Sequence, residues 1–171
     1  MDFDKRKTVG SIVVASAALI SAIAGYEGFV PHTYEDTVGV KTIGFGHTGP
    51  DVKDGQKITK AQAYELLVKD INKHWDSIKK SIRVPLHQYE AEAYTSFSYN
   101  VGAGNFRSST LLKKLNLKDY AGACKQLLKW TRAGGKVLPG LVKRRQDEYQ
   151  MCIGKSDAKA AAIVGKYQSG S

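Results

Sequence analysis

The N-terminal region sets the strongest limit on how this chain folds, because a basic cluster precedes a long stretch without charge. Residues Lys5–Lys7 are followed by Thr8–Tyr26, a run of 19 uncharged residues. As one helix the run would extend roughly 28 Å, about the thickness of a bilayer's hydrocarbon core. It holds only seven Val, Ile or Leu residues, worth roughly −2 to −4 kcal/mol of insertion, and eleven Ala, Gly, Ser or Thr residues. Such a segment can enter a membrane and also leave it.

Three interpretations fit this run. Ala22-Ile23-Ala24 has the small-x-small pattern of a signal-peptide cleavage site. The run also suits an Ala-rich core helix of a cytosolic protein, or a weak signal anchor that is later released. We expect the third, with residues 1–26 as a releasable anchor, residues 27–154 as one domain and residues 155–171 as a tail.

The net charge of +10 comes from one part of the chain. The numbers of basic and acidic residues are equal over residues 1–106, and again over residues 146–171. Between Arg107 and Arg145 there are eleven basic residues and a single acid, Asp119. This charge indicates a polyanionic partner: nucleic acid, anionic lipid or bacterial wall polymer. Zinc spacing, RNP motifs and basic-zipper heptads are missing from the run, so we expect no nucleic acid.

Length and residue pattern predict one domain of class α+β. Gly, β-branched and aromatic residues alternate over Phe29–Ile58 and predict short strands. Thr59 and Gln62 form a capping box, and apolar residues at a 3.6-residue period predict a long helix ending before Pro85. We therefore expect a small β lobe joined by a long helix to a larger helical lobe, with a cleft between them. The further predicted helices are His87–Asn100, closed by Gly102, then Ser109–Leu115, Lys118–Trp130 and Gly140–Gly154.

The cysteines and histidines point to no metal. Cys124 and Cys152 lie on predicted helices and lack the CxxC spacing of a zinc site. If the body of the protein is exported they are able to pair, but the sequence leaves open whether they form a disulfide or two buried thiols. His32, His74 and His87 show no metal-ligand spacing, and we expect neither a metal nor another cofactor.

Two carboxyl groups and a hydroxyl lie where the apolar run meets the predicted strands. Glycoside hydrolysis requires a protonated carboxyl group on one side of the scissile bond and an ionised one on the other. Glu27, at the end of an apolar helix, is placed to be desolvated and so to stay protonated. Asp36, in a polar loop, would remain ionised, and the hydroxyl of Thr42 can hold a water molecule. Taken alone this spacing is weak evidence, because most Glu and Asp side chains are solvated surface groups.

The same residues resemble a known family. Glu27, eight residues, Asp36, five residues and Thr42 resemble the signature of glycoside hydrolase family 24, the phage lysozymes that include the T-even phage lysozyme. The blocks 99–106 and 130–136 resemble lambdoid-phage endolysins of that family. The resemblance covers roughly residues 25–154. Together with the N-terminal run, it is to the signal-anchor-release subgroup.

This resemblance implies a lysozyme-like fold and a muramidase, which cleaves the β-1,4 bond between N-acetylmuramic acid and N-acetylglucosamine to lyse the bacterial host. Glu27 would act as the general acid, and Asp36 with Thr42 would orient the attacking water, with inversion implied. A retaining route with Asp36 as nucleophile stays open, since it depends on the separation of the two carboxyl groups. Tyr99 suits a sugar-stacking or a core aromatic role equally. The resemblance also implies saccharide contacts for Thr48, Tyr99, Asn100 and Ser109.

Further expectations follow from the resemblance. It implies a structural ion pair between His47 and Asp70. It places the protein as a monomer in the host inner membrane, facing the periplasm, until loss of the membrane potential releases it to the periplasm and its peptidoglycan strands. The released helix would then pack into the body and complete the cleft. Two other functions remain open: a lytic transglycosylase using Glu27 alone, and a membrane- or nucleic-acid-binding module built on the basic region 107–145.

Overall fold

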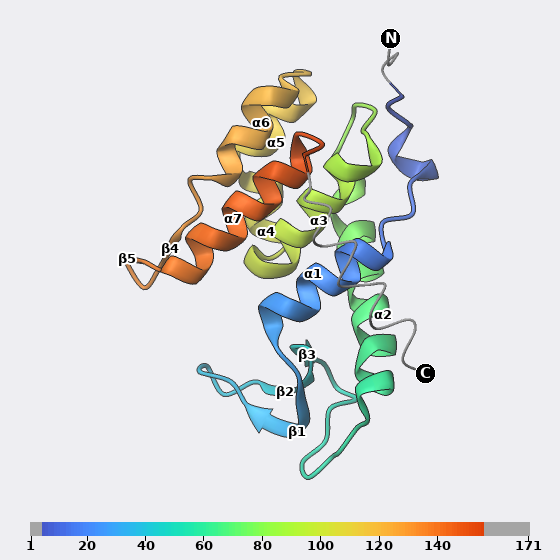
Figure 1. Ribbon diagram of the computed structural model, residues 1–171, viewed down its shortest axis with the longest axis vertical. Helices are drawn as coiled ribbons and strands as arrows, with labels where there is room; N and C mark the ends of the chain where they lie inside the picture. Colours follow the sequence, from blue (N-terminus) through green and yellow to red (C-terminus); the bar gives the residue numbers. More distant parts are fainter. Residues whose placement is uncertain (1–4, 156–171) are drawn as a thin grey trace.

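Two lobes and one connecting helix make up the described part of the chain, residues 5–155 of a computed structural model. A small three-stranded sheet lies at one end and the helices gather at the other (Figure 1). Helix α2 (Lys60–Lys79) begins beside the sheet and runs into the helical lobe. This is the predicted α+β arrangement of two lobes and a long helix.

The β lobe is an antiparallel meander. Its strands are β1 (Val30–Glu35), β2 (Lys41–Gly44) and β3 (His47–Thr48), paired in that order. Thr42, at the centre of the sheet, pairs with Tyr34 of β1 on one side and with Thr48 of β3 on the other. Residues 36–40 form the β1–β2 turn.

Helix α2 begins at the predicted capping box. The Thr59 hydroxyl accepts a hydrogen bond from the Gln62 backbone at 3.1 Å, and Gln62 Oε1 accepts one from the Thr59 backbone at 2.8 Å. These bonds satisfy two of the amide groups that a helix start otherwise leaves unpaired. One face of α2 is buried against both lobes, through Ala63, Leu67, Ile71, Trp75 and Ile78.

The helical lobe packs around one buried helix. Helix α3 (Gln88–Val101) contacts α2 on one side and α7 (Pro139–Cys152) on the other, and most of the α3 side chains are buried. The predicted helix 118–130 is shorter than expected, since it spans only Tyr120–Leu127. A short helix after Gly102 and a two-stranded hairpin were missed. The elements of the lobe are α3 (Gln88–Val101), α4 (Ala103–Ser108), α5 (Thr110–Asn116), α6 (Tyr120–Leu127), β4 (Arg132–Ala133), β5 (Lys136–Val137) and α7 (Pro139–Cys152).

The uncharged N-terminal run folds in three pieces. A single 3-10 turn, Val9–Ser11, is followed by extended chain and then by α1 (Ala17–Glu27). Ser16 caps α1, because its hydroxyl accepts a hydrogen bond from the Leu19 backbone at 3.1 Å. The expected boundary between residues 26 and 27 therefore lies inside α1. Over residues 5–155, the structure has no helix with both the length and the hydropathy needed to cross a membrane.

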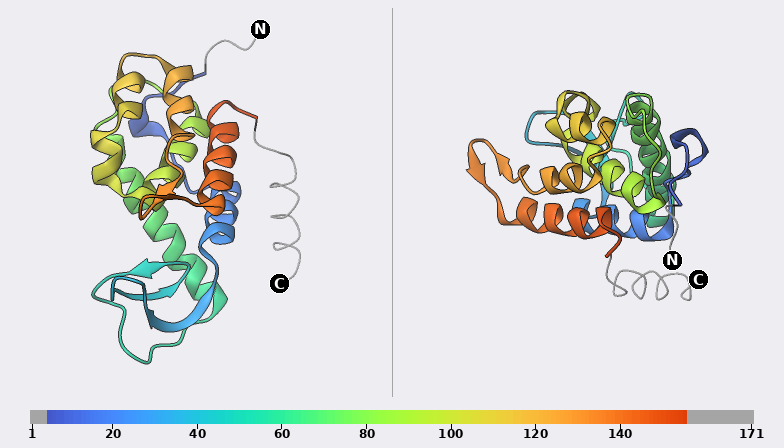
Figure 2. Two further views of the ribbon diagram at one scale, coloured as in Figure 1. Left: turned by 90° about the vertical axis from the view of Figure 1, so that its left-hand side faces the viewer. Right: turned by 90° about the horizontal axis from the view of Figure 1, so that it is seen from above.

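The segment before α1, residues 5–16, lies along the helical lobe and is called the N-terminal strap below. Lys7 and Leu86 exchange two backbone hydrogen bonds, of 2.7 and 2.9 Å. The Trp75 indole donates to the Ile12 carbonyl at 3.2 Å, and the Gln88 amide donates to the Val13 carbonyl at 2.6 Å. Ile12 is also buried in the common core. Figure 2 shows α1 continuing from the strap and reaching the β lobe at its C-terminal end.

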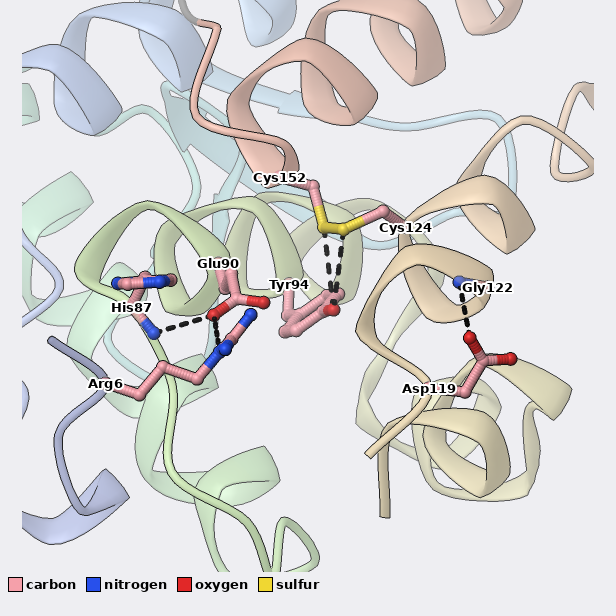
Figure 3. Close-up of a disulfide and its surroundings, with 8 residues drawn as sticks. All are labelled: Arg6, His87, Glu90, Tyr94, Asp119, Gly122, Cys124 and Cys152. Carbon is pink, nitrogen blue, oxygen red and sulfur yellow. Dashed lines mark hydrogen bonds and ion pairs between the residues drawn. A yellow bond between two sulfur atoms is a disulfide. The ribbon is translucent and has the colours of Figure 1, made fainter. Parts of the chain in front are cut away.

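A disulfide ties α6 to α7. Cys124 and Cys152 are bonded, so the question that the sequence left open has an answer in the structure. The hydroxyl of Tyr94, on α3, lies 3.5 Å from the Cys152 sulfur and 3.9 Å from the Cys124 sulfur (Figure 3). Burial raises the pKa of Tyr94, so the hydroxyl stays protonated and is the donor. The predicted tail, residues 155–171, lies outside the described residues except for Lys155.

Candidate active site

Glu27 is the last residue of α1 and lies where the helical lobe meets the β lobe. Its side chain is 25% exposed, and Oε1 accepts a hydrogen bond from Nη1 of Arg144 at 2.9 Å. The other oxygen, Oε2, faces Gly46, at which a Cβ atom would lie 3.3 Å away. Gly46 has a φ of 80°, so both its conformation and this close approach favour glycine. The apolar surroundings expected from the sequence are thus replaced by an arginine.

Arg144 is itself buried and forms hydrogen bonds with two residues besides Glu27. It lies on α7 with 5% of its surface exposed. Its Nε donates to Oε1 of Glu148 at 3.2 Å, and its Nη2 donates to the Ser96 carbonyl at 3.0 Å. Glu148 is fully buried and accepts a further bond from the Ser96 hydroxyl at 2.7 Å. The guanidinium that holds Glu27 is therefore fixed by α3 and α7 together.

Arg145 extends this buried network toward the surface. Its Nη1 donates to Glu148, its Nη2 to the Asn100 side-chain oxygen, and its Nε to the Trp130 carbonyl at 3.0 Å. Burial lowers the pKa of Arg145, while the Glu148 carboxylate acts in the opposite direction. The side-chain oxygen of Asn100 therefore already accepts a hydrogen bond from within the protein.

Asp36 begins the β1–β2 turn and shapes it. Its Oδ1 accepts hydrogen bonds from the backbone of Val38 at 2.9 Å and of Val40 at 2.8 Å. Its own backbone N–H donates to the Val40 carbonyl at 3.0 Å. Its second carboxylate oxygen accepts no hydrogen bond from residues 5–155. The carboxylate is therefore oriented through one oxygen and open through the other.

Thr42 shares an acceptor with Asp36. The buried hydroxyl of Thr42 donates to the same Val40 carbonyl at 2.9 Å. Because the Thr42 hydroxyl and the Asp36 backbone nitrogen both donate to this carbonyl oxygen, they lie within about 6 Å of each other. Because its proton is used in this way, the Thr42 oxygen is left as an acceptor.

The other predicted saccharide-binding residues lie in different surroundings. Thr48 is exposed and faces Thr42 across the β2–β3 ladder. The Tyr99 hydroxyl donates to the Phe45 carbonyl at 3.0 Å, and its ring lies 4.9 Å from that of His74. Burial raises the pKa of Tyr99. Ser109 is buried and caps α5, accepting from the Leu112 backbone at 3.1 Å. Saccharide contact by these residues stays a prediction.

His47 lies between two carboxylates. Its Nδ1 is 2.8 Å from Oδ2 of Asp70, as the resemblance implied, and its Nε2 is 2.9 Å from Oδ2 of Asp51. Burial lowers the pKa of His47, but the hydrogen bonds to Asp70 and Asp51 outweigh burial and raise it. The ring can donate to both carboxylates only when both nitrogens carry a proton. The geometry thus favours the histidine cation.

Sequence reasoning missed the groups that hold the predicted residues in place. Arg144 is 117 positions from Glu27, and only the neighbouring basic and acidic residues near the end of the chain hinted at a paired cluster. Asp51, four residues after His47, is a local partner that spacing alone can suggest. Among residues 5–155, no three His, Cys, Asp or Glu side chains gather to hold a metal ion.

Comparisons with known proteins place this chain and its fold in a family. The phage lysozyme family profile matches residues 24–148. The SAR-endolysins of bacteriophage PS119 and of Enterobacteria phage P21 are each 44% identical over 146 residues, covering 84% of this chain and 87% and 88% of theirs. A crystal structure of a P22 lysozyme mutant superposes with a TM-score of 0.75 at 35% identity, covering 83% of this chain and 99% of that one. The chain therefore belongs to the phage lysozyme family and is a lysozyme-type glycosidase that acts on peptidoglycan.

Proposed function

We propose that the protein is an N-acetylmuramidase that cleaves the β-1,4 bond between N-acetylmuramic acid and N-acetylglucosamine. Glu27 is its general acid, and Asp36 with Thr42 positions the water. The observation that carries this proposal is the setting of Glu27, whose carboxyl is fixed by Arg144 and open toward Gly46 where the β lobe begins. The three side chains also match the family's Glu, Asp and Thr spacing.

The acid step uses the free oxygen of Glu27. Because Arg144 engages Oε1, the proton to be donated lies on Oε2. As the bond from C1 of the muramic acid to the bridging oxygen lengthens, that proton moves to the bridging oxygen. The glucosamine leaves with a hydroxyl at C4, and Glu27 becomes a carboxylate beside the Arg144 cation.

The water step uses two acceptors. A water molecule donates one hydrogen to Thr42 Oγ1 and the other to the open oxygen of Asp36, which turns a lone pair toward C1. Asp36 takes the proton as the new C1–O bond forms, and its transfer back to Glu27 through solvent restores the enzyme. The product is a muramic acid with a free reducing end.

Product analysis tests this mechanism. Glu27→Gln should abolish release of reducing ends from purified peptidoglycan, with Glu35→Gln, an exposed carboxyl on β1, as the matched control. Mass spectrometry should find reducing muramic acid, with its anomeric form at C1 inverted when followed by NMR during the reaction. Near-full lysis by Glu27→Gln would rule out the assignment. Anhydro-muramic ends formed without need of Asp36 would select a transglycosylase instead.

We also infer that residues 8–26 anchor the protein in the host inner membrane, with the body in the periplasm, before this segment docks as an N-terminal strap and α1. Three observations support this: the uncharged run behind Lys5–Lys7, the SAR-endolysin relatives, and the Cys124–Cys152 disulfide, a bond that persists in oxidising compartments such as the periplasm. While the run spans the bilayer, Glu27 lies against the membrane and cannot meet glycan.

Fractionation of expressing cells tests the anchor. The full-length protein should be in the membrane fraction before an uncoupler is added and in the soluble periplasmic fraction afterwards. A soluble form that begins at Gly25 would instead demonstrate cleavage of a signal peptide. A protein that is soluble in the cytosol throughout would rule out both.

A further inference from the structure

Arg6, from the basic cluster at the start of the N-terminal strap, forms an ion pair inside the helical lobe. Its Nε donates to Oε1 of Glu90 on α3 at 2.9 Å, and only 2% of the Glu90 side chain is exposed. Figure 3 shows the guanidinium beside this carboxylate, which also accepts a hydrogen bond from the His87 backbone at 2.7 Å. Among residues 5–155, Arg6 is the one cation that pairs with Glu90. A buried carboxylate without its cation is costly, so this position requires a positive charge.

An aromatic ring completes the position that Arg6 occupies. The guanidinium carbon lies 3.6 Å from the ring centroid of Tyr120, the first residue of α6. The Tyr120 hydroxyl donates to the Pro85 carbonyl at 2.8 Å, which fixes the ring. A planar guanidinium can stack on a ring and pair with a carboxylate at the same time, whereas an ammonium group lacks this planar shape. Glu90 and Tyr120 therefore form a guanidinium site between α3 and α6.

The backbone next to Arg6 is held at the same place. Lys7 and Leu86 exchange their two backbone hydrogen bonds in the segment that leads into α3. The side chain of Lys7 is exposed and takes no part in the Glu90 pair. The start of the strap is thus fixed by one charged pair and one short backbone pairing.

The same basic cluster has different surroundings in the proposed anchored form. While residues 8–26 span the bilayer, roughly 28 Å of helix separates Lys5–Lys7 from the body of the protein. Positively charged residues that flank a membrane segment stay on the cytoplasmic side, whereas Glu90 lies with the body in the periplasm. Arg6 cannot then reach Glu90, and the strap supplies no ligand to the guanidinium site.

We propose that Glu90 and Tyr120 form a binding site for a guanidinium group, which Arg6 fills only after the strap has left the membrane. This inference rests on the proposed anchor. Before release, Arg6 helps to keep the N-terminus cytoplasmic. Afterwards the same side chain neutralises Glu90 and holds the strap on the helical lobe. The pair makes release directional, because a strap that re-enters the bilayer must break it and leave Glu90 buried without a cation.

Amide exchange and vesicle binding test the site in the released, full-length protein. Glu90→Gln keeps an acceptor for the His87 backbone and removes the charge. It should speed exchange of the Leu86 amide, which donates to the Lys7 carbonyl, about tenfold, and raise binding to neutral phosphatidylcholine vesicles about tenfold. Arg6→Gln should do the same, and the double variant should add little to either. The matched control, Lys7→Gln, removes an equal charge from the same cluster and should leave both readouts unchanged.

Chemical rescue tests the class of ligand. Arg6→Ala should have a Tm about 5 °C below that of the wild type, and added ethylguanidinium should restore part of this loss. Ethylammonium, which carries the same charge without the planar group, should restore less. Neither compound should raise the Tm of Arg6→Ala/Glu90→Gln. Equal rescue by the two compounds, or rescue that survives Glu90→Gln, overturns the guanidinium assignment.

The remaining outcomes separate the site from the anchor. Unchanged Leu86 exchange in both Glu90→Gln and Arg6→Gln overturns the site, and so does an equal change in Lys7→Gln. Unchanged vesicle binding in the two variants overturns the role in release. A wild type that never enters the membrane fraction contradicts the proposed anchor itself, and the role in release falls with it, whether or not Arg6 and Glu90 pair.

Discussion

The two sides of the candidate active site are built in opposite ways. On the helical side, Glu27 is held by Arg144, whose own partners are buried, charged and drawn from α3 and α7. On the β side, Asp36 is held by backbone N–H groups of its own turn, and that turn is exposed. Side chains distant in sequence fix Glu27, the proposed acid, whereas residues within a few positions fix Asp36 and Thr42, the proposed water-binding pair. We expect the helical side to couple catalysis to global stability, and the β side to be nearly independent of it.

The largest expected effect is on the β side, where activity should be lost while the free energy of unfolding hardly changes. Asp36→Asn keeps an oxygen that can accept the same two backbone hydrogen bonds, so the free energy of unfolding should change by less than about 0.5 kcal/mol. Loss of the carboxylate should lower kcat about 100- to 10,000-fold. Kinetics on peptidoglycan and urea unfolding measure the two quantities. A large loss of stability would contradict the independence of the β side.

Removing the buried carboxylate should have the opposite effect on the helical side. Glu148→Gln leaves Arg145 without its carboxylate in a fully buried position, and this should cost about 3–5 kcal/mol of unfolding free energy. Arg144 also loses a partner, so activity should fall together with stability. The control is Lys143→Gln on the same helix, whose exposed ion pair with Asp147 should contribute less than about 1 kcal/mol. Urea unfolding distinguishes the two, and equal effects would contradict a special role for the buried network.

The disulfide is a further difference between the two lobes, because within residues 5–155 only the helical lobe contains one. Cys124→Ser/Cys152→Ser opens a loop with a sequence separation of 28 residues and should lower the free energy of unfolding by about 3–4 kcal/mol. Thermal unfolding should show a lower Tm, and a reducing agent should do the same to the wild type only. A variant with an unchanged Tm would indicate that the lobe's core alone determines its stability.

The smallest expected effect lies at the junction of the lobes and depends on pH. Folding raises the pKa of His47, so its contribution to stability is fully present below the ordinary histidine value of about 6.5 and is lost as pH rises through the raised value. His47→Asn should therefore lower the unfolding free energy by about 1–2 kcal/mol near pH 5.5, and by less near pH 9. The exposed His32→Asn variant should show no such trend. A destabilisation that grows with pH would contradict the cationic assignment.

Local signals in the sequence predicted local structure well. The Thr59 and Gln62 capping box gave the start of α2, because both of its bonds form within one turn of the chain. The glycine-rich segment gave the β lobe for the same reason. The β4–β5 hairpin was missed, although Gly134-Gly135 is a standard hairpin turn signal. A search for paired strands around that dipeptide would have found it.

Contacts between residues far apart in the sequence could not be predicted from the sequence. The run 8–26 was expected as one helix, since in a bilayer only a helix can satisfy its backbone. In the folded protein Trp75 and Gln88 supply hydrogen bonds to the carbonyls of Ile12 and Val13, so part of the run can be extended. Nothing within the run reveals these donors. Arg144 was missed likewise, because its contact with Glu27 exists only once α7 is packed.

The long separation between Glu27 and Arg144 has a consequence for synthesis. The ribosome makes Glu27 first and Arg144 117 residues later, which takes roughly 6–23 s at ordinary elongation rates of 5–20 residues per second. Throughout that time the nascent chain lacks the α7 that fixes Glu27. A chain that stops before Arg144 therefore lacks the guanidinium that holds Glu27 in the folded protein.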